Sequence, residues 1–122
     1  MAPTDAAGGV PGRRVLDLLG LSARAGALVT GTDAVRQAVR EGRVHRVFLA
    51  EDAAPGQRQK LEPLLQARKV PSHILFSRVE LGSAVGRSPV SAVGVIDRNL
   101  ARRAGELAEA LPKPKSRGAA EP

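Results

Sequence analysis

The sequence contains no cysteine, tyrosine or tryptophan, and its only aromatic side chains are those of Phe48 and Phe76. Without cysteine the chain forms no disulfide, offers no thiolate to zinc and has no thiol nucleophile. With so few aromatic side chains it also lacks the stacking platform on which many proteins bind single-stranded bases. These absences leave charge and backbone as the features that could bind a partner.

Long apolar runs are also missing. No run approaches the roughly 20 residues that a membrane-spanning helix needs, and residues 1–12 have neither the basic nor the apolar region of a secretory signal. We therefore expect a cytoplasmic protein that has no membrane partner. A chain of 122 residues has room for one core. We expect one globular domain at 13–111, between a flexible segment at 1–12 and a flexible, basic, proline-rich tail at 112–122.

Positive charge is in excess. The chain has 19 Lys and Arg against 12 Asp and Glu, which gives a formal net charge of +7. Such a field attracts polyanions, and nucleic acid is the leading partner. A basic protein without a nucleic-acid partner is the alternative. Because aromatic residues are few, the composition favours folded RNA recognised through phosphates, base edges and shape.

Apolar periodicity predicts alternating helices and strands. The second helix is expected to begin at Thr32 as its N-cap, to bury Val35, Ala38 and Val39, and to end at Gly42. Pro63 leaves two interpretations of the third helix, which either kinks there or starts nearby. The predicted order is a helix ending at Gly26, a strand at 27–30, the second helix, a strand at 44–50, the third helix, a strand at 72–76, a short helix opened by a capping box of Ser77 and Glu80, a strand at 90–96, and a final helix capped by Asp97. This order predicts a three-layer α/β/α sandwich.

Residues able to perform catalysis do not form a convincing group. The candidates are His45, His73, Glu51, Asp52 and Ser91. The histidines belong to different strands without companion ligands, and the two acids precede a helix, where acids usually accept from backbone donors. The glycines at 82–94 lack a dinucleotide-binding pattern, and no phosphate-binding lysine motif exists. We therefore expect no enzyme activity, no metal and no cofactor.

The second helix carries the more informative basic residues. Arg36 and Arg40 lie one turn apart and away from the buried face, and the helix entrance is Gly31, Thr32 and Asp33. Free backbone N–H groups there, with no side chain at Gly31, would let a phosphate or sugar approach. The alternative is a solvated helix face on which Glu41 offsets the arginines.

A glycine-rich loop is the second candidate binding segment. Its residues are Gly86, Arg87, Ser88, Pro89, Val90 and Ser91. Small residues permit close backbone approach, Arg87 offers a guanidinium, and Val90 could cover an extruded base.

Three motifs together resemble one family. They are LLGLSARAGALVTG at 18–31, AVRQAVREGRVHRVFLAEDA at 34–53 and ELGSAVGRSPVSAVGVID at 80–97. In order and spacing they are similar to the kink-turn RNA-binding ribosomal-protein superfamily of large-subunit proteins seven-Ae and thirty-e, especially its small bacterial YlxQ-type members. The resemblance implies a mixed four-stranded sheet, and an RNA site formed by the start of the second helix and the loop before the last strand. The implied partners are structured RNA, ribosomal RNA above all, and ribosomal proteins; we expect a monomer.

The resemblance is incomplete at the helix entrance. RNA-reading members usually have Gly, a small residue, Asn, Glu and, three residues later, Lys; Gly31 and Thr32 match, whereas Asp33, Ala34 and Gln37 do not. Phosphate binding by Arg36, Arg40 and Arg87 is still expected, with fewer contacts to sheared G·A pairs. Two other functions stay open: a protein-interaction module of the same fold and, ranked last, an enzyme or a domain detached from one.

Overall fold

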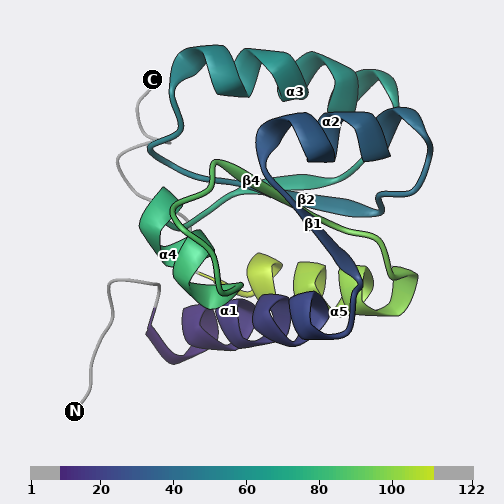
Figure 1. The fold of residues 1–122 in the computed structure, drawn as a ribbon. Helices are drawn as coiled ribbons and strands as arrows, with labels where there is room; N and C mark the ends of the chain where they lie inside the picture. Colours follow the sequence, from purple (N-terminus) through teal and green to yellow (C-terminus); the bar gives the residue numbers. More distant parts are fainter. Residues whose placement is uncertain (1–8, 112–122) are drawn as a thin grey trace, which may run out of the picture.

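The computed structural model describes residues 9–111, which form an α/β/α sandwich (Figure 1). Residues 1–8 and 112–122, most of the two segments expected to be flexible, lie outside the described residues. The elements in chain order are α1 (Gly9–Arg24), β1 (Leu28–Thr30), α2 (Thr32–Arg40), β2 (Arg46–Leu49), α3 (Pro55–Ala67), β3 (Ser72–Ile74), α4 (Arg78–Ala84), β4 (Ala92–Val95) and α5 (Arg98–Glu109). Within the described range, no helix is both long and apolar enough to cross a membrane.

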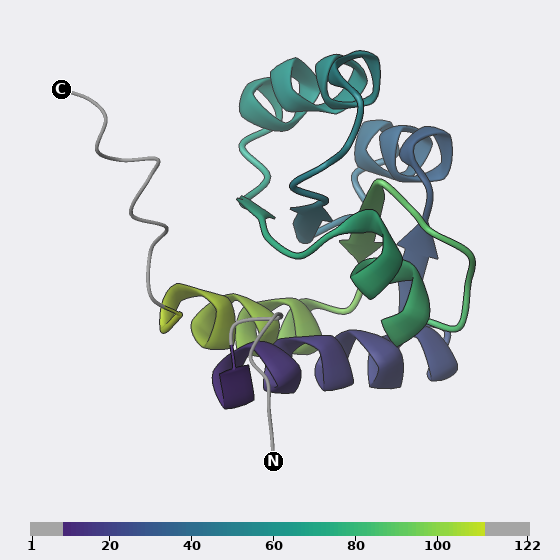
Figure 2. The ribbon, with the colours of Figure 1, turned by 90° about the vertical axis from the view of Figure 1, so that its left-hand side faces the viewer.

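The four strands form one mixed sheet in the order β1-β4-β2-β3. Strand β4 pairs antiparallel with β1 and with β2, while β2 pairs parallel with β3. Helices α2 and α3 cover one face, and α1, α4 and α5 lie on the other (Figures 1 and 2). The sandwich and the mixed sheet expected from the sequence are therefore confirmed.

Each face of the sheet has its own apolar core, because successive strand residues point to opposite faces. Phe48 belongs to the core beneath α1, α4 and α5, whereas its neighbours Val47 and Leu49 belong to the core beneath α2 and α3. The buried face predicted for α2 is also correct, since Val35, Ala38 and Val39 are all buried. The two cores fix both helix layers against the same short strands.

Three predicted boundaries need correction. Helix α1 begins at Gly9, inside the segment expected to be flexible, and includes Pro11; proline is tolerated in a first turn because N–H groups there have no partner within the helix. Helix α3 runs from Pro55 through Pro63, so a start near Pro63 is wrong. Thr32 is not the N-cap of α2; that position is held by Gly31.

Other predicted helix ends are correct. Ser77 and Glu80 form the capping box of α4, with Glu80 N donating to Ser77 Oγ at 3.0 Å and Ser77 N to Glu80 Oε1 at 2.8 Å. Asp97 caps α5 by accepting from Leu100 N at 2.9 Å. Gly42 follows α2 at φ 73, and its N–H donates to the Val39 carbonyl at 3.0 Å. Such left-handed glycines are common where helices end.

Candidate nucleic-acid interface

The entrance of α2 depends on the backbone of Gly31. This residue has φ 96 and ψ 145, and its carbonyl accepts the first helical hydrogen bond from Val35 N at 2.9 Å. The accepting carbonyl and non-helical dihedrals define Gly31 as the N-cap. Thr32 is therefore the first residue of the helix, and it is only 7% exposed. No side chain caps this end of α2. Its first backbone donors therefore remain available for a ligand.

The loop at 86–91 packs along α4. Arg87 N donates to the Gly82 carbonyl at 2.8 Å, and Val90 N donates to the Arg78 carbonyl at 3.1 Å. Arg87, Ser88 and Pro89 are exposed, whereas Val90 and Ser91 are half-buried. Val90 also packs against the core on the α1 side, so only part of its side chain could meet a base.

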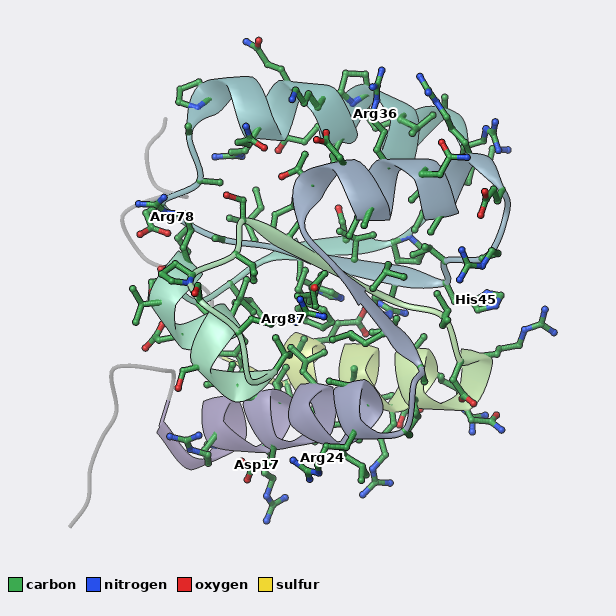
Figure 3. All side chains as sticks on the ribbon, in the orientation of Figure 1. Asp17, Arg24, Arg36, His45, Arg78 and Arg87 are labelled. Atoms are coloured by element: carbon green, nitrogen blue, oxygen red, sulfur yellow. The ribbon has the colours of Figure 1, made fainter. Side chains whose placement is uncertain are left out.

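Hydrogen bonds to β4 and its preceding residue join the loop to the helix entrance. Gly31 N donates to the Ala92 carbonyl at 2.8 Å, and Ala50 N donates to the Ser91 carbonyl at 2.9 Å. The loop therefore ends where α2 begins, as the resemblance implied. In Figure 3, Arg36 lies beside α2 and α3, while Arg78 and Arg87 lie lower, near α4.

The side chains at the entrance have partners within the protein. Asp33 Oδ1 lies 3.6 Å from Lys60 Nζ, with the Asp33 side chain 86% exposed. Gln37 Nε2 donates to Glu41 Oε2 at 2.9 Å, and Arg43 Nη1 donates to Glu41 Oε1 at 3.0 Å. The bond from Gln37, and then that from Arg43, lowers the pKa of Glu41. Exposed pairs of this kind are weak and can exchange partners.

The three arginines of the predicted site do not form one cluster. Arg36 is half-buried and Arg87 is exposed, and neither has an acidic partner within residues 9–111. Arg40 is at the other end of α2, about 12 Å along the axis from Thr32 at about 1.5 Å per residue. The structure thus separates Arg40 from the entrance. Glu41 pairs with Arg43, so it does not offset Arg36 and Arg40 as the alternative interpretation assumed.

The catalytic candidates do not form one group, because His45 lies before β2 and the acids Glu51 and Asp52 lie after it. His73 Nε2 is 2.7 Å from Arg46 Nη1, and its ring stacks on Phe48 with centroids 5.2 Å apart. Asp52 Oδ1 accepts from Arg78 N at 2.8 Å, so it caps α4 and not the helix that follows it in sequence. Among residues 9–111, no group of three or more His, Cys, Asp or Glu side chains could hold a metal ion.

Sequence reasoning missed two participants at this end. Lys60 comes from α3 and places a cation beside Asp33, while the Ala92 carbonyl fixes Gly31. Both contacts join segments that are distant in the sequence. No local pattern around either residue could have indicated them.

Together, the glycine-bounded helix entrance, the adjoining loop and the sandwich beneath them define a small α/β/α domain with a mixed four-stranded sheet. The chain belongs to the ribosomal protein L7Ae/L30e/S12e/Gadd45 family, whose model matches residues 13–104. This membership confirms the resemblance inferred from the three motifs.

Known proteins similar to the chain include RNA-binding protein YlxQ of Enterococcus faecium, 31% identical over 97 residues that cover 80% of this chain and 93% of the relative. RNA-binding protein YlxQ of Bacillus subtilis is 35% identical over 86 residues, covering 70% and 86%. A solved structure of a protein with unknown function from Bacillus halodurans has a TM-score of 0.76 and 34% identity, covering 79% of this chain and 97% of that chain. The two YlxQ relatives are named as RNA-binding proteins, a third relative is the large ribosomal subunit protein eL8 of Thermoplasma acidophilum, 31% identical over 86 residues that cover 70% of this chain and 71% of the relative, and the family is described by ribosomal proteins. The expected non-enzymatic class is confirmed.

Proposed function

We propose that this protein binds structured RNA through the entrance of α2 and the loop at 86–91. The observation that carries the proposal is the hydrogen bond from Gly31 N to the Ala92 carbonyl at 2.8 Å, because it brings the uncapped helix end next to the loop. The RNA-binding relatives support the same partner. Ribosomal or kink-turn-like RNA is the proposed target, bound by a monomer in the cytoplasm.

Phosphate contacts supply most of the proposed affinity. The backbone donors at the start of α2 suit a phosphate oxygen because they lack internal acceptors and lie at the positive end of the helix dipole. Arg87 extends from the loop and Arg36 from the first turns of α2. When phosphate approaches, it competes with Asp33 for Lys60, and this exposed pair gives way at little cost.

Base contacts are fewer in this proposal. Asp33 is an acceptor that pairs with Lys60, Gln37 donates to Glu41, and Ala34 has no polar side-chain group. Phosphate contacts set position and affinity but carry no sequence information. The protein should therefore bind folded RNA with modest preference for a kink-turn over other structures.

The test is a titration of a labelled structured RNA at two salt concentrations. Affinity should fall steeply with salt, because each phosphate contact releases counterions. The double substitution Arg36→Gln with Arg87→Gln should weaken binding and flatten the salt dependence, whereas Arg13→Gln with Arg14→Gln removes equal charge from α1 and serves as the matched control. Absence of binding, or equal losses in both double variants, would overturn the proposed site.

A protein-interaction module of the same fold is the second candidate function. It is favoured by the internal pairing of Asp33 and Gln37, which occupies side chains that would otherwise contact bases. Such a module would bind a protein partner with little dependence on salt and would not retain RNA. The same titration therefore separates the two functions.

A further inference from the structure

Charge is nearly balanced around the α2 entrance. We call this region, with the starts of α3 and α4 and the loop at 86–91, the entrance end. Most of its cations face carboxylates: Arg58 Nη2 lies 2.8 Å from Glu62, Lys60 lies 3.6 Å from Asp33, and Arg78 Nε lies 3.7 Å from Asp52. Glu51 and Glu80 add further negative charge, and Arg36 and Arg87 are the cations of this region without an acidic partner among residues 9–111.

The opposite end of the sheet is assembled from loops that hydrogen-bond to one another. His45 N donates to the Val95 carbonyl at 2.9 Å, Ile96 N to the Ala27 carbonyl at 2.9 Å, and Val47 N to the Pro71 carbonyl at 3.0 Å. These bonds bring together the ends of α1, α2 and α3 and the start of α5. We call this region the far end; Figure 3 shows His45 there, across the molecule from Arg78.

Exposed cations collect at the far end. They are Arg40, Arg43, Arg68, Lys69 and Arg98. The acids beside them are already engaged: Glu41 accepts from Gln37 and Arg43, and Asp97 accepts from Leu100 N. The excess positive charge of the described chain is therefore displayed away from the α2 entrance.

One of these cations is held in place by backbone. Arg68 Nη1 donates to the Arg40 carbonyl at 3.1 Å and lies 3.4 Å from the Val39 carbonyl. Arg68 thus spans the last turns of α2 and α3 and keeps its charge beside Arg40. A guanidinium fixed in this way loses little freedom when it meets a phosphate.

We propose that the far end binds a second segment of RNA phosphate backbone, so that one domain bridges two RNA segments. This inference rests on the proposed function, which assigns the first segment to the entrance end. The two regions lie at opposite ends of the strands and face different directions, so they would contact separate phosphates. An acidic protein suits the far end less well, since protein interfaces depend on Trp, Tyr and Arg side chains in well-packed, desolvated pockets, and the only aromatic side chains of the chain, Phe48 and Phe76, are buried. Near the far end, the described chain exposes one large apolar side chain, that of Leu21 in the last turns of α1.

The experiment is a capture assay with the full chain. A structured RNA is immobilised, the protein is bound to it, and capture of a second, labelled RNA duplex is measured as salt rises. The test variant carries Lys69→Gln and Arg98→Gln, two exposed far-end residues without acidic partners within residues 9–111. Arg13→Gln with Arg14→Gln again removes the same charge from α1, and circular dichroism checks the fold of both variants.

The proposal predicts that wild type and the α1 control capture the duplex, whereas the far-end variant keeps the immobilised RNA but captures the duplex more weakly. Because each lost phosphate contact reduces the log–log salt slope by about 0.7 to 0.9, the far-end variant should lower the slope for capture by about 1.4 to 1.8. Equal capture by all three proteins, or none by wild type while it holds the first RNA, would overturn the bridging. Displacement of the duplex by polyglutamate at equal charge would also overturn it, in favour of an acidic protein partner. Failure to hold the immobilised RNA would instead contradict the proposed function.

Discussion

Gly82 of α4 lies directly against the backbone carbonyl of Ser88, and this carbonyl occupies the space that a Cβ atom at position 82 would need. Its own carbonyl accepts from Arg87 N at 2.8 Å, so helix and loop touch through backbone alone. The glycine costs α4 some helix propensity. In exchange, it lets the loop at 86–91 lie close to α4 and end beside the entrance of α2.

The substitution Gly82→Ala should therefore displace the loop. The new methyl group meets the Ser88 backbone, which cannot move away as a flexible side chain would, and overpacking of this kind typically costs about 1 to 3 kcal/mol. Chemical denaturation measures the loss, and RNA affinity should fall with it. Gly56→Ala on α3 is the control: no atom lies within 4 Å of the added Cβ, so stability should hold or rise by up to about 1 kcal/mol. Equal effects at both glycines would contradict the close contact.

A second glycine, Gly105 of α5, leaves space for the nearly buried side chain of Arg46. The Arg46 guanidinium packs where a Gly105 side chain would project, and the Arg46 side chain is only 16% exposed. Gly105→Ala should destabilise the native protein by about 1 to 3 kcal/mol. In an Arg46→Ala background the same change should cost much less, because the space is then vacant. A double-mutant cycle with no coupling between these positions would show that they do not meet.

Glu41 provides a test that depends on pH. Its pKa is lowered first by the hydrogen bond from Gln37 and then by Arg43. A carboxylate with a lowered folded-state pKa contributes stability that is present above its unfolded pKa and is lost as pH falls through the folded pKa. Gln37→Ala should raise the Glu41 pKa toward the ordinary glutamate value, as followed by carboxyl NMR. A titration curve that does not move would mean that the two side chains do not interact in solution.

The sequence predicted the order of elements and the buried faces well, because both follow from local periodicity. The sequence analysis placed the N-cap of α2 at Thr32 because threonine is a good capping residue. In the structure the N-cap is Gly31, which has a positive φ and whose N–H donates to the Ala92 carbonyl. Likewise, Gly82 in isolation only weakens a helix. Its role is visible once Ser88 lies against it.

Charge was the harder property to place from the sequence. The net charge and the glycine-rich loop at 86–91 could be recognised in the sequence. The ion pairs of Lys60 with Asp33 and of Asp52 with Arg78 could not, because each joins residues from different elements. Arg36 and Arg40 read as one face because they share helical spacing. In the structure Arg36 is half-buried in the middle of α2, whereas Arg40 is exposed in its last turn, so of the two Arg36 lies nearer the entrance.

Restoring the family's usual residues should increase selectivity more than affinity. The triple substitution Asp33→Asn, Ala34→Glu and Gln37→Lys supplies base-contacting groups, each good contact giving about 1 to 3 kcal/mol of discrimination. It also removes the carboxylate that pairs with Lys60. Paired titrations of a kink-turn RNA and a plain duplex should show a wider gap for the triple variant than for wild type. If wild type already prefers the kink-turn RNA over the duplex by about a hundredfold, or roughly 2.7 kcal/mol, the conclusion that it makes few base contacts is contradicted.

The most direct measurement of the central claim is a residue-by-residue map of RNA binding by amide NMR. With a short structured RNA added to isotope-labelled protein, the largest shift changes should fall on Gly31, Thr32 and Asp33 and on the loop at 86–91. Because the loop ends beside Gly31, both segments should respond at the same RNA concentration. Changes confined to surfaces away from these segments, or no changes at all with folded RNA, would contradict the account.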